Sequence, residues 1–93
     1  MSEPAERYRL IMARSAARAL STTLPEKVAT AVYEFVTGPL LDSPRRVGKP
    51  LDPPLALAYS ARRGTYRVLY LINDKNRTVE VTAISHRADA YRT

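Results

Sequence analysis

Apolar residues in the first forty positions recur in a pattern that predicts a short strand followed by two helices. The run Tyr8–Met12 mixes aromatic and β-branched residues, which favours an opening strand. Ser15 is a suitable N-cap for a short helix over Ala16–Leu20. A second helix begins around Pro25, and the Gly-Pro pair that follows it ends it. Its apolar positions form one stripe at helical spacing: Val28, Ala31, Val32, Phe35 and Val36.

The second half of the chain predicts strands joined by turns. Leu40–Pro54 holds four of the seven prolines, and we expect an ordered loop that crosses the fold. Three segments rich in β-formers then follow: Leu55–Ala61, Tyr66–Ile72 and Val79–Ile84. The turns between them, at Gly64-Thr65 and at residues 73–76, are short, so consecutive strands must run antiparallel.

These elements predict an α+β fold, with an N-terminal strand and a helical hairpin packed on a curved antiparallel sheet of about four strands. The opening strand can add at an edge, and residues 1–93 form a single domain. Alternation along Tyr66–Ile72 places Tyr66, Tyr70 and their apolar neighbours under the helices. Arg67 then faces the opposite side of the sheet, near its centre.

Composition narrows the class of protein. An apolar content of 45% is typical of a folded globule, and no run approaches the roughly 18 apolar residues of a membrane helix. The acidic N-terminus lacks the apolar core of a secretory signal. The chain has no cysteine, which excludes disulfides and thiolate catalysis, and its single histidine argues against a transition-metal site. We expect a cytoplasmic protein without a metal or cofactor.

The basic charge is unevenly distributed. The net charge is +6 and the pI about 10.1. Between positions 42 and 67, two aspartates face six basic residues: Arg45, Arg46, Lys49, Arg62, Arg63 and Arg67. This asymmetry favours an anionic partner, either a nucleic acid or an acidic protein. The alternative is a solvated basic surface.

An arginine within an apolar strand is costly to desolvate unless an anion meets it, which singles out Arg67. The last eight residues include His86, Arg87 and Tyr91. Several arginines, an imidazole and a tyrosine on adjoining segments are groups that can bind and cleave a phosphodiester.

Three strings along the chain carry a family likeness. The string "RVGKPL" follows the helical hairpin, "SARRGTYRVLYLI" covers two strands, and "ISHRADAY" closes the chain. In this order, from Tyr8 to Tyr91, they resemble the RelE/ParE superfamily of toxin–antitoxin toxins, and most closely its RelE branch of messenger-RNA endonucleases. The resemblance implies a fold related to small microbial ribonucleases.

The resemblance also implies an activity: metal-independent cleavage of mRNA in the ribosomal A site, by attack of a ribose 2′-OH on the adjacent phosphate. Arg67 matches the family's phosphate-clamping sheet arginine, and Arg62 matches a neighbouring basic position. Arg87 and Tyr91 match the C-terminal arginine and tyrosine. The implied partners are the ribosome, mRNA and an acidic antitoxin that wraps the sheet or displaces the C-terminal segment.

The chain departs from the family at one strand. Well-studied members carry lysines there, where this chain has Ala58 and Ser60. His86 is the candidate substitute, because an imidazole can shuttle protons near neutral pH; alternatively the enzyme is weak and relies on the ribosome to align the RNA. We assign Arg62 and Arg63 to substrate binding, and the loop residues Arg45, Arg46 and Lys49 to contact with ribosomal RNA.

Each of these residues also has a structural interpretation without a role in function. Arg67 could form a salt bridge with Glu80 or another carboxylate, His86 could be an imidazole on the surface or rim, and Tyr91 could pack the C-terminal tail on the sheet. Two other functions also compete: a ParE-like poison of DNA gyrase, and a non-catalytic basic module that binds RNA or an acidic protein. The short first helix and the terminal His-Arg-Tyr group favour the nuclease.

Overall fold

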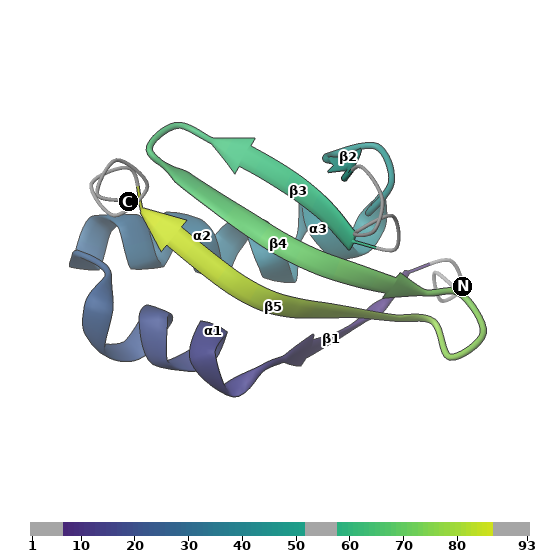
Figure 1. Ribbon diagram of the computed structural model, residues 1–93, viewed down its shortest axis with the longest axis horizontal. Coiled ribbons are helices and arrows are strands. Elements are labelled where there is room, and N and C mark those ends of the chain that lie inside the picture. Colours follow the sequence, from purple (N-terminus) through teal and green to yellow (C-terminus); the bar gives the residue numbers. More distant parts are fainter. Residues whose placement is uncertain (1–6, 52–57, 87–93) are drawn as a thin grey trace.

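The computed structural model describes residues 7–51 and 58–86, which form one sheet with helices on one side (Figure 1). The helical elements are α1 (Arg14–Arg18), the π-helical turn η1 (Ala19–Thr23), α2 (Glu26–Thr37) and α3 (Pro39–Asp42). The strands are β1 (Arg9–Met12), β2 (Lys49–Pro50), β3 (Ala58–Arg63), β4 (Tyr66–Asn73) and β5 (Thr78–His86). None of the described helices has the length and apolar character needed to cross a membrane.

Helix α2 matches its predicted stripe closely. Val32, Phe35 and Val36 are buried, and Val28 packs against the core from its edge. Ala31 is exposed instead, because the stripe drifts around the helix, and its carbonyl accepts a hydrogen bond of 3.4 Å from Tyr66 Oη.

The first helix differs from the prediction. Ser15 lies inside α1, not at its N-cap, and its hydroxyl donates to the carbonyl of Thr82 at 3.0 Å, which ties the helix to β5. The expected break at Ser21–Thr23 is a π-helical turn, in which the Ser21 and Thr22 hydroxyls donate to the Arg18 carbonyl. The two hydroxyls thus bond back to a carbonyl three and four residues earlier, as serine and threonine inside helices often do.

Part of the predicted loop is regular structure. Helix α3 begins at Pro39, which suits a first turn, and it buries Leu40 and Leu41. Lys49–Pro50 then pairs with β3 as the two-residue strand β2. Helix α3 is a single turn and β2 has only two residues. Elements this short leave no periodic pattern of apolar residues in the sequence.

The sheet has the strand order β1-β5-β4-β3-β2 and is mixed, with five strands instead of about four antiparallel ones. The three predicted strands β3, β4 and β5 pair antiparallel as expected. The opening strand lies at an edge, as expected, but it runs parallel to β5. The helices between β1 and the rest of the sheet return the chain to its starting end, which allows this parallel pairing.

The core lies between the helices and one face of the sheet. Tyr66, Val68 and Tyr70 are buried there, as strand alternation predicts. Tyr70 is completely buried, stacks on Tyr59 with ring centroids 5.6 Å apart, and donates a hydrogen bond of 2.6 Å to the Pro44 carbonyl. Helices α2 and α3 lie behind the sheet in Figure 1 and α1 lies beside β5, so no described helix crosses the front of the sheet.

Candidate nucleic-acid interface

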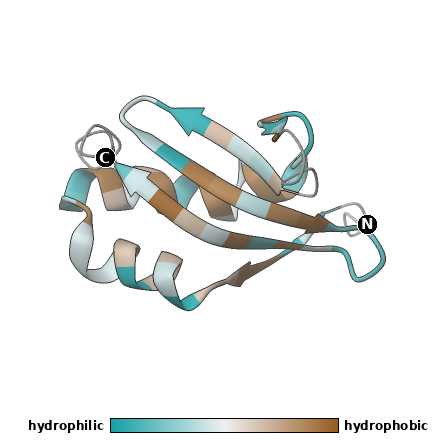
Figure 2. Ribbon diagram, viewed as in Figure 1, coloured by the Kyte–Doolittle hydropathy of each residue, from teal (hydrophilic) through white to brown (hydrophobic). Residues whose placement is uncertain are grey.

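The bare side of the sheet, called the open face below, is defined by strand register. Residues directly opposite one another in paired strands project to the same face. From β2 to β5, the open face therefore carries Lys49, Ala58, Ser60, Arg62, Arg67, Leu69, Leu71, Glu80, Ala83 and Ser85. Because of a β-bulge between Leu69 and Tyr70, Thr82 of β5 has no residue directly opposite it on β4. Figure 2 shows hydrophilic colour where β3 and β4 meet at their turn and hydrophobic colour along the middle of β4.

Arg62 and Arg67 form a directly opposed cross-strand pair. Both side chains are exposed, and neither has an ion pair within the described part of the chain. Like charges in this arrangement repel, with Cβ atoms only about 4.5–5.5 Å apart. The pair therefore concentrates positive potential at one point of an uncovered surface, which is the condition for binding a phosphate.

The alternative pairing of Arg67 with Glu80 is not formed. Glu80 opposes Leu71, which is four residues along β4 from Arg67, a distance of about 13 Å. Both aspartates in the described ranges are paired elsewhere, Asp42 with Arg7 and Asp74 with Arg45. Their negative charge thus lies away from the two open-face arginines.

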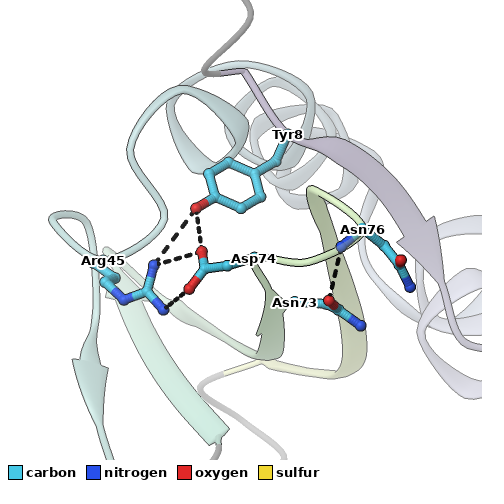
Figure 3. Close-up of polar contacts among 5 residues, drawn as sticks. All are labelled: Tyr8, Arg45, Asn73, Asp74 and Asn76. Carbon is cyan, nitrogen blue, oxygen red and sulfur yellow. Dashed lines mark hydrogen bonds and ion pairs between the residues drawn. The ribbon is translucent and has the colours of Figure 1, made fainter.

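The predicted basic loop is divided between two roles. Arg45 binds Asp74 through two hydrogen bonds of 3.0 and 2.7 Å, and Tyr8 Oη donates to the same carboxylate at 2.5 Å (Figure 3). The Arg45 hydrogen bond, followed by that of Tyr8, lowers the pKa of Asp74 to about 2. This cluster joins the N-terminal segment, the loop and the β4–β5 turn, so Arg45 has a structural partner. Arg46 is exposed, while Lys49 reaches the open face beside Ser60.

Arg63 does not join the open face, although it adjoins Arg62 in the sequence. It opposes Tyr66, whose side chain is buried on the helix side. Its guanidinium lies 4.7 Å from the centroid of the Phe35 ring, and it donates to the Val47 carbonyl at 3.1 Å. Arg63 therefore fastens the loop to the helix side, which differs from its predicted role in substrate binding.

The described residues do not bring His86 to Arg67. His86 ends β5 opposite Tyr66, on the helix side, whereas the residue opposite Arg67 is Ser85. The predicted site residues Arg87 and Tyr91 lie outside the described residues. Sequence reasoning missed Ser85, whose hydroxyl shares the open face with Arg67; extending strand alternation from β4 across to β5 would have found it.

The apolar hollows found among the described residues do not lie on the open face. Two apolar hollows in the described ranges lie elsewhere, one between η1 and α2 and one between α2 and the β3–β4 turn. No group of three His, Cys, Asp or Glu side chains that could hold a metal is found within residues 7–51 and 58–86. The cationic side chains of Lys49, Arg62 and Arg67 can together bind several anionic groups of one extended ligand.

Comparison with known proteins agrees with this architecture. Residues 9–91 match the family model described as the ParE toxin of the type II toxin–antitoxin system parDE. The chain is similar to Toxin RelE of Mycobacterium tuberculosis, at 49% identity over 85 residues that cover 91% of this chain and 87% of that protein. It is also similar to Toxin RelG of the same organism, at 54% identity over 69 residues, covering 74% and 79%.

Solved structures show the same fold. The RelBE2 toxin–antitoxin complex of M. tuberculosis contains a chain with a TM-score of 0.83 and 46% identity, covering 87% of this chain and 99% of that one. The isolated E. coli RelE toxin has a TM-score of 0.70 at 22% identity, covering 85% and 83%, which supports the fold alone. The chain therefore belongs to the RelE/ParE family of toxins from type II toxin–antitoxin systems.

Proposed function

We propose that this chain inhibits translation by cutting messenger RNA on the ribosome. The observation that carries the proposal is the opposed pair Arg62 and Arg67, exposed and without ion pairs among the described residues, on the open face. The similarity to Toxin RelE and Toxin RelG supports the choice within the family.

The arginine pair suits the charge that develops in this reaction. Attack of a ribose 2′-OH on the adjacent phosphate places additional negative charge on the phosphoryl oxygens. Two guanidiniums side by side can each donate hydrogen bonds to those oxygens, and charge-assisted bonds of this kind are about twice as strong as neutral ones. The Ser85 hydroxyl, opposite Arg67, can add a further donor to the same phosphate.

The family's proton-transfer residues do not carry over to this chain, because Ala58 and Ser60 stand on the strand where well-studied members have lysines. We propose that Arg87 and Tyr91 contact the substrate, as the family resemblance implies. His86 is the candidate proton shuttle, and its role is tested below. The register counts against His86, because it opposes the buried Tyr66 and not the open face. Alignment of the RNA by the ribosome can itself supply up to about 7–11 kcal/mol of the barrier reduction, so efficient cleavage requires the ribosome.

We also propose that an acidic antitoxin neutralises the chain in the cytoplasm. The relatives solved as complexes include RelBE2 of M. tuberculosis, E. coli RelBE and RelE–RelB of Pyrococcus horikoshii. A disordered acidic peptide that folds on binding can cover the cationic open face and block access of RNA to it.

The test is induced expression in bacteria with primer-extension mapping of mRNA 5′ ends. The wild type is compared with Arg67→Ala, with His86→Ala, and with Arg18→Ala, which removes an exposed arginine from α1 on the helix side. We expect new in-frame ends inside translated regions with the wild type and Arg18→Ala, and their loss with Arg67→Ala. Loss with His86→Ala as well, in a protein shown to be folded, would restore the proton-shuttle role.

A second candidate function is poisoning of DNA gyrase. The description of the matching family model as a ParE toxin favours it, as does the absence of an imidazole on the open face within residues 58–86. Growth arrest with intact mRNA and trapped gyrase–DNA complexes would support this function and contradict the nuclease.

A further inference from the structure

The segment Pro44–Gly48 is held against the helix side of the sheet by side chains of two strands. Tyr70 of β4 donates from its buried hydroxyl to the Pro44 carbonyl at 2.6 Å. Arg63 of β3 donates to the Val47 carbonyl at 3.1 Å while it covers the Phe35 ring. These two bonds fix both halves of the segment relative to the sheet.

Gly48 allows the closest approach of this segment. A Cβ atom built there would overlap Tyr70 Oη and would lie 2.9 Å from the Ser60 carbonyl oxygen, closer than Cβ atoms come in real structures. Because the segment passes this close to the sheet edge, the next residue, Lys49, enters the sheet opposite Ser60. The lysine thereby reaches the open face from an otherwise irregular loop.

Lys49 extends the arginine pair into a diagonal row across three strands. It opposes Ser60, and Arg62 lies two residues further along the same strand, opposite Arg67. Strand spacing and rise place the Cα atom of Lys49 roughly 8 Å from that of Arg62 and roughly 12 Å from that of Arg67. Lys49 is exposed and has no ion pair within the described ranges.

We infer that the open face binds two phosphates of one RNA strand, the first between Arg62 and Arg67 and the second at Lys49, and that Tyr70 is a positioning residue that holds Lys49 in place. The inference rests on the proposed function, since it concerns the RNA of that site. The RNA strand then crosses the sheet along a path from β4 towards the edge formed by β2. It also gives the buried hydroxyl of Tyr70 a role on the far side of the sheet from its own ring.

The two residues act differently in this arrangement. Lys49→Ala removes one phosphate contact, which lowers the slope of log affinity against log salt by about 0.7 for a single strand. An exposed contact of this kind changes affinity by up to about fivefold. Tyr70→Phe keeps the buried ring but deletes the bond to Pro44, so the segment loosens and Lys49 loses its fixed place. Tyr70→Phe should therefore weaken RNA binding only when Lys49 is present.

The experiment measures binding of a short single-stranded RNA with 2′-deoxy residues, which cannot be cut, by fluorescence anisotropy over a range of salt concentrations. The variants are Lys49→Ala, Tyr70→Phe and the double variant, with Arg67→Ala as the comparison at the proposed first phosphate site and Arg18→Ala as the charge control. We expect Lys49→Ala to reduce the salt slope and Tyr70→Phe to weaken binding, while the double variant binds no more weakly than Lys49→Ala alone. Lys49→Arg should restore the slope, and circular dichroism with urea unfolding confirms that each variant is folded.

The outcomes separate this inference from the proposed function. If Arg67→Ala lowers affinity and slope but Lys49→Ala leaves both at the wild-type values, the second phosphate contact is wrong and the first stands. If Tyr70→Phe weakens binding equally with and without the lysine, its role is structural only, which overturns the positioning role. If the wild type binds this RNA no better than Arg67→Ala, the inference is overturned, whereas the proposed function, which acts on the ribosome, is judged separately by the mapped mRNA ends.

Discussion

The close approach of Gly48 to the sheet makes a sharp prediction about stability. In Gly48→Ala the new methyl group collides with Tyr70 Oη, and Tyr70 cannot retreat because its ring is completely buried and stacked on Tyr59. The loop must therefore move. Forcing an extra carbon into a packed site costs about 1–3 kcal/mol. Breaking the buried bond from Tyr70 to the Pro44 carbonyl adds about 1–3 kcal/mol, so we expect a total of about 2–6 kcal/mol.

Gly64 provides the matched control. It lies in the β3–β4 turn with φ +57°, and a Cβ atom there would have no neighbour within 4 Å. Gly64→Ala therefore costs only the left-handed backbone strain of about 1–2 kcal/mol. Gly64→Asn should cost less, because asparagine tolerates this region, whereas Gly48→Asn should cost at least as much as Gly48→Ala.

Urea unfolding followed by circular dichroism measures these differences. The midpoint should fall most for the two Gly48 variants, with an unchanged slope of free energy against urea. The reasoning is refuted if Gly48→Ala is no less stable than Gly64→Ala, or if asparagine is tolerated equally at both positions. Either result would mean that the Pro44–Gly48 segment is not held at the distance seen in the structure.

Three further predictions follow from charges and burial. The pKa of Asp74 is lowered to about 2, chiefly by its hydrogen bond from Arg45, so the stability that it contributes is present above pH about 4 and is lost as the pH falls towards 2. Asp74→Asn should flatten thermal stability over that range, and an unchanged profile would contradict the pairing. Burial raises the pKa of Tyr70 to about 12, so Tyr70→Phe should remove a late-ionising phenolate from an ultraviolet titration, and stability should fall less steeply above pH 10 in this variant than in the wild type. Arg62→Ala removes the repulsion between this residue and Arg67, so it should raise the free energy of unfolding by about 0.2–1 kcal/mol at low salt. The same change should weaken RNA binding. A lower free energy of unfolding would show that the two arginines do not repel one another in the folded protein.

Local patterns carried most of the fold. The helical stripe of α2 and the alternation along β4 are set by which side chains can be buried, so both are visible in the sequence. The parallel pairing of β1 and the two-residue strand β2 depend on contacts between segments far apart in the chain, which no local period records. Helix α3 is likewise fixed by the burial of Leu40 and Leu41.

The candidate site was predicted in part, and strand extent decided the rest. The exposure of Arg67 on the face opposite the helices follows from alternation and is confirmed. The prediction ended the last strand at Ile84, whereas β5 continues to His86, so His86 obeys strand alternation and faces the helix side. The same alternation separates the neighbours Arg62 and Arg63, which the charge count had grouped together.

The central claim is that the phosphate being cut lies at the open-face arginine pair. The most direct measurement is single-turnover cleavage of mRNA by the purified protein on programmed ribosomes, with Arg67→Ala, Arg67→Lys and Arg18→Ala beside the wild type. We predict a loss of about 10²–10³-fold for Arg67→Ala, the effect of removing one preorganised donor to a developing anion. Arg67→Lys should recover only part of it, because a lysine keeps the charge without the planar fork, and Arg18→Ala should cleave at the wild-type rate. Cleavage by Arg67→Ala at the wild-type rate would contradict the claim and place the chemistry elsewhere on the protein.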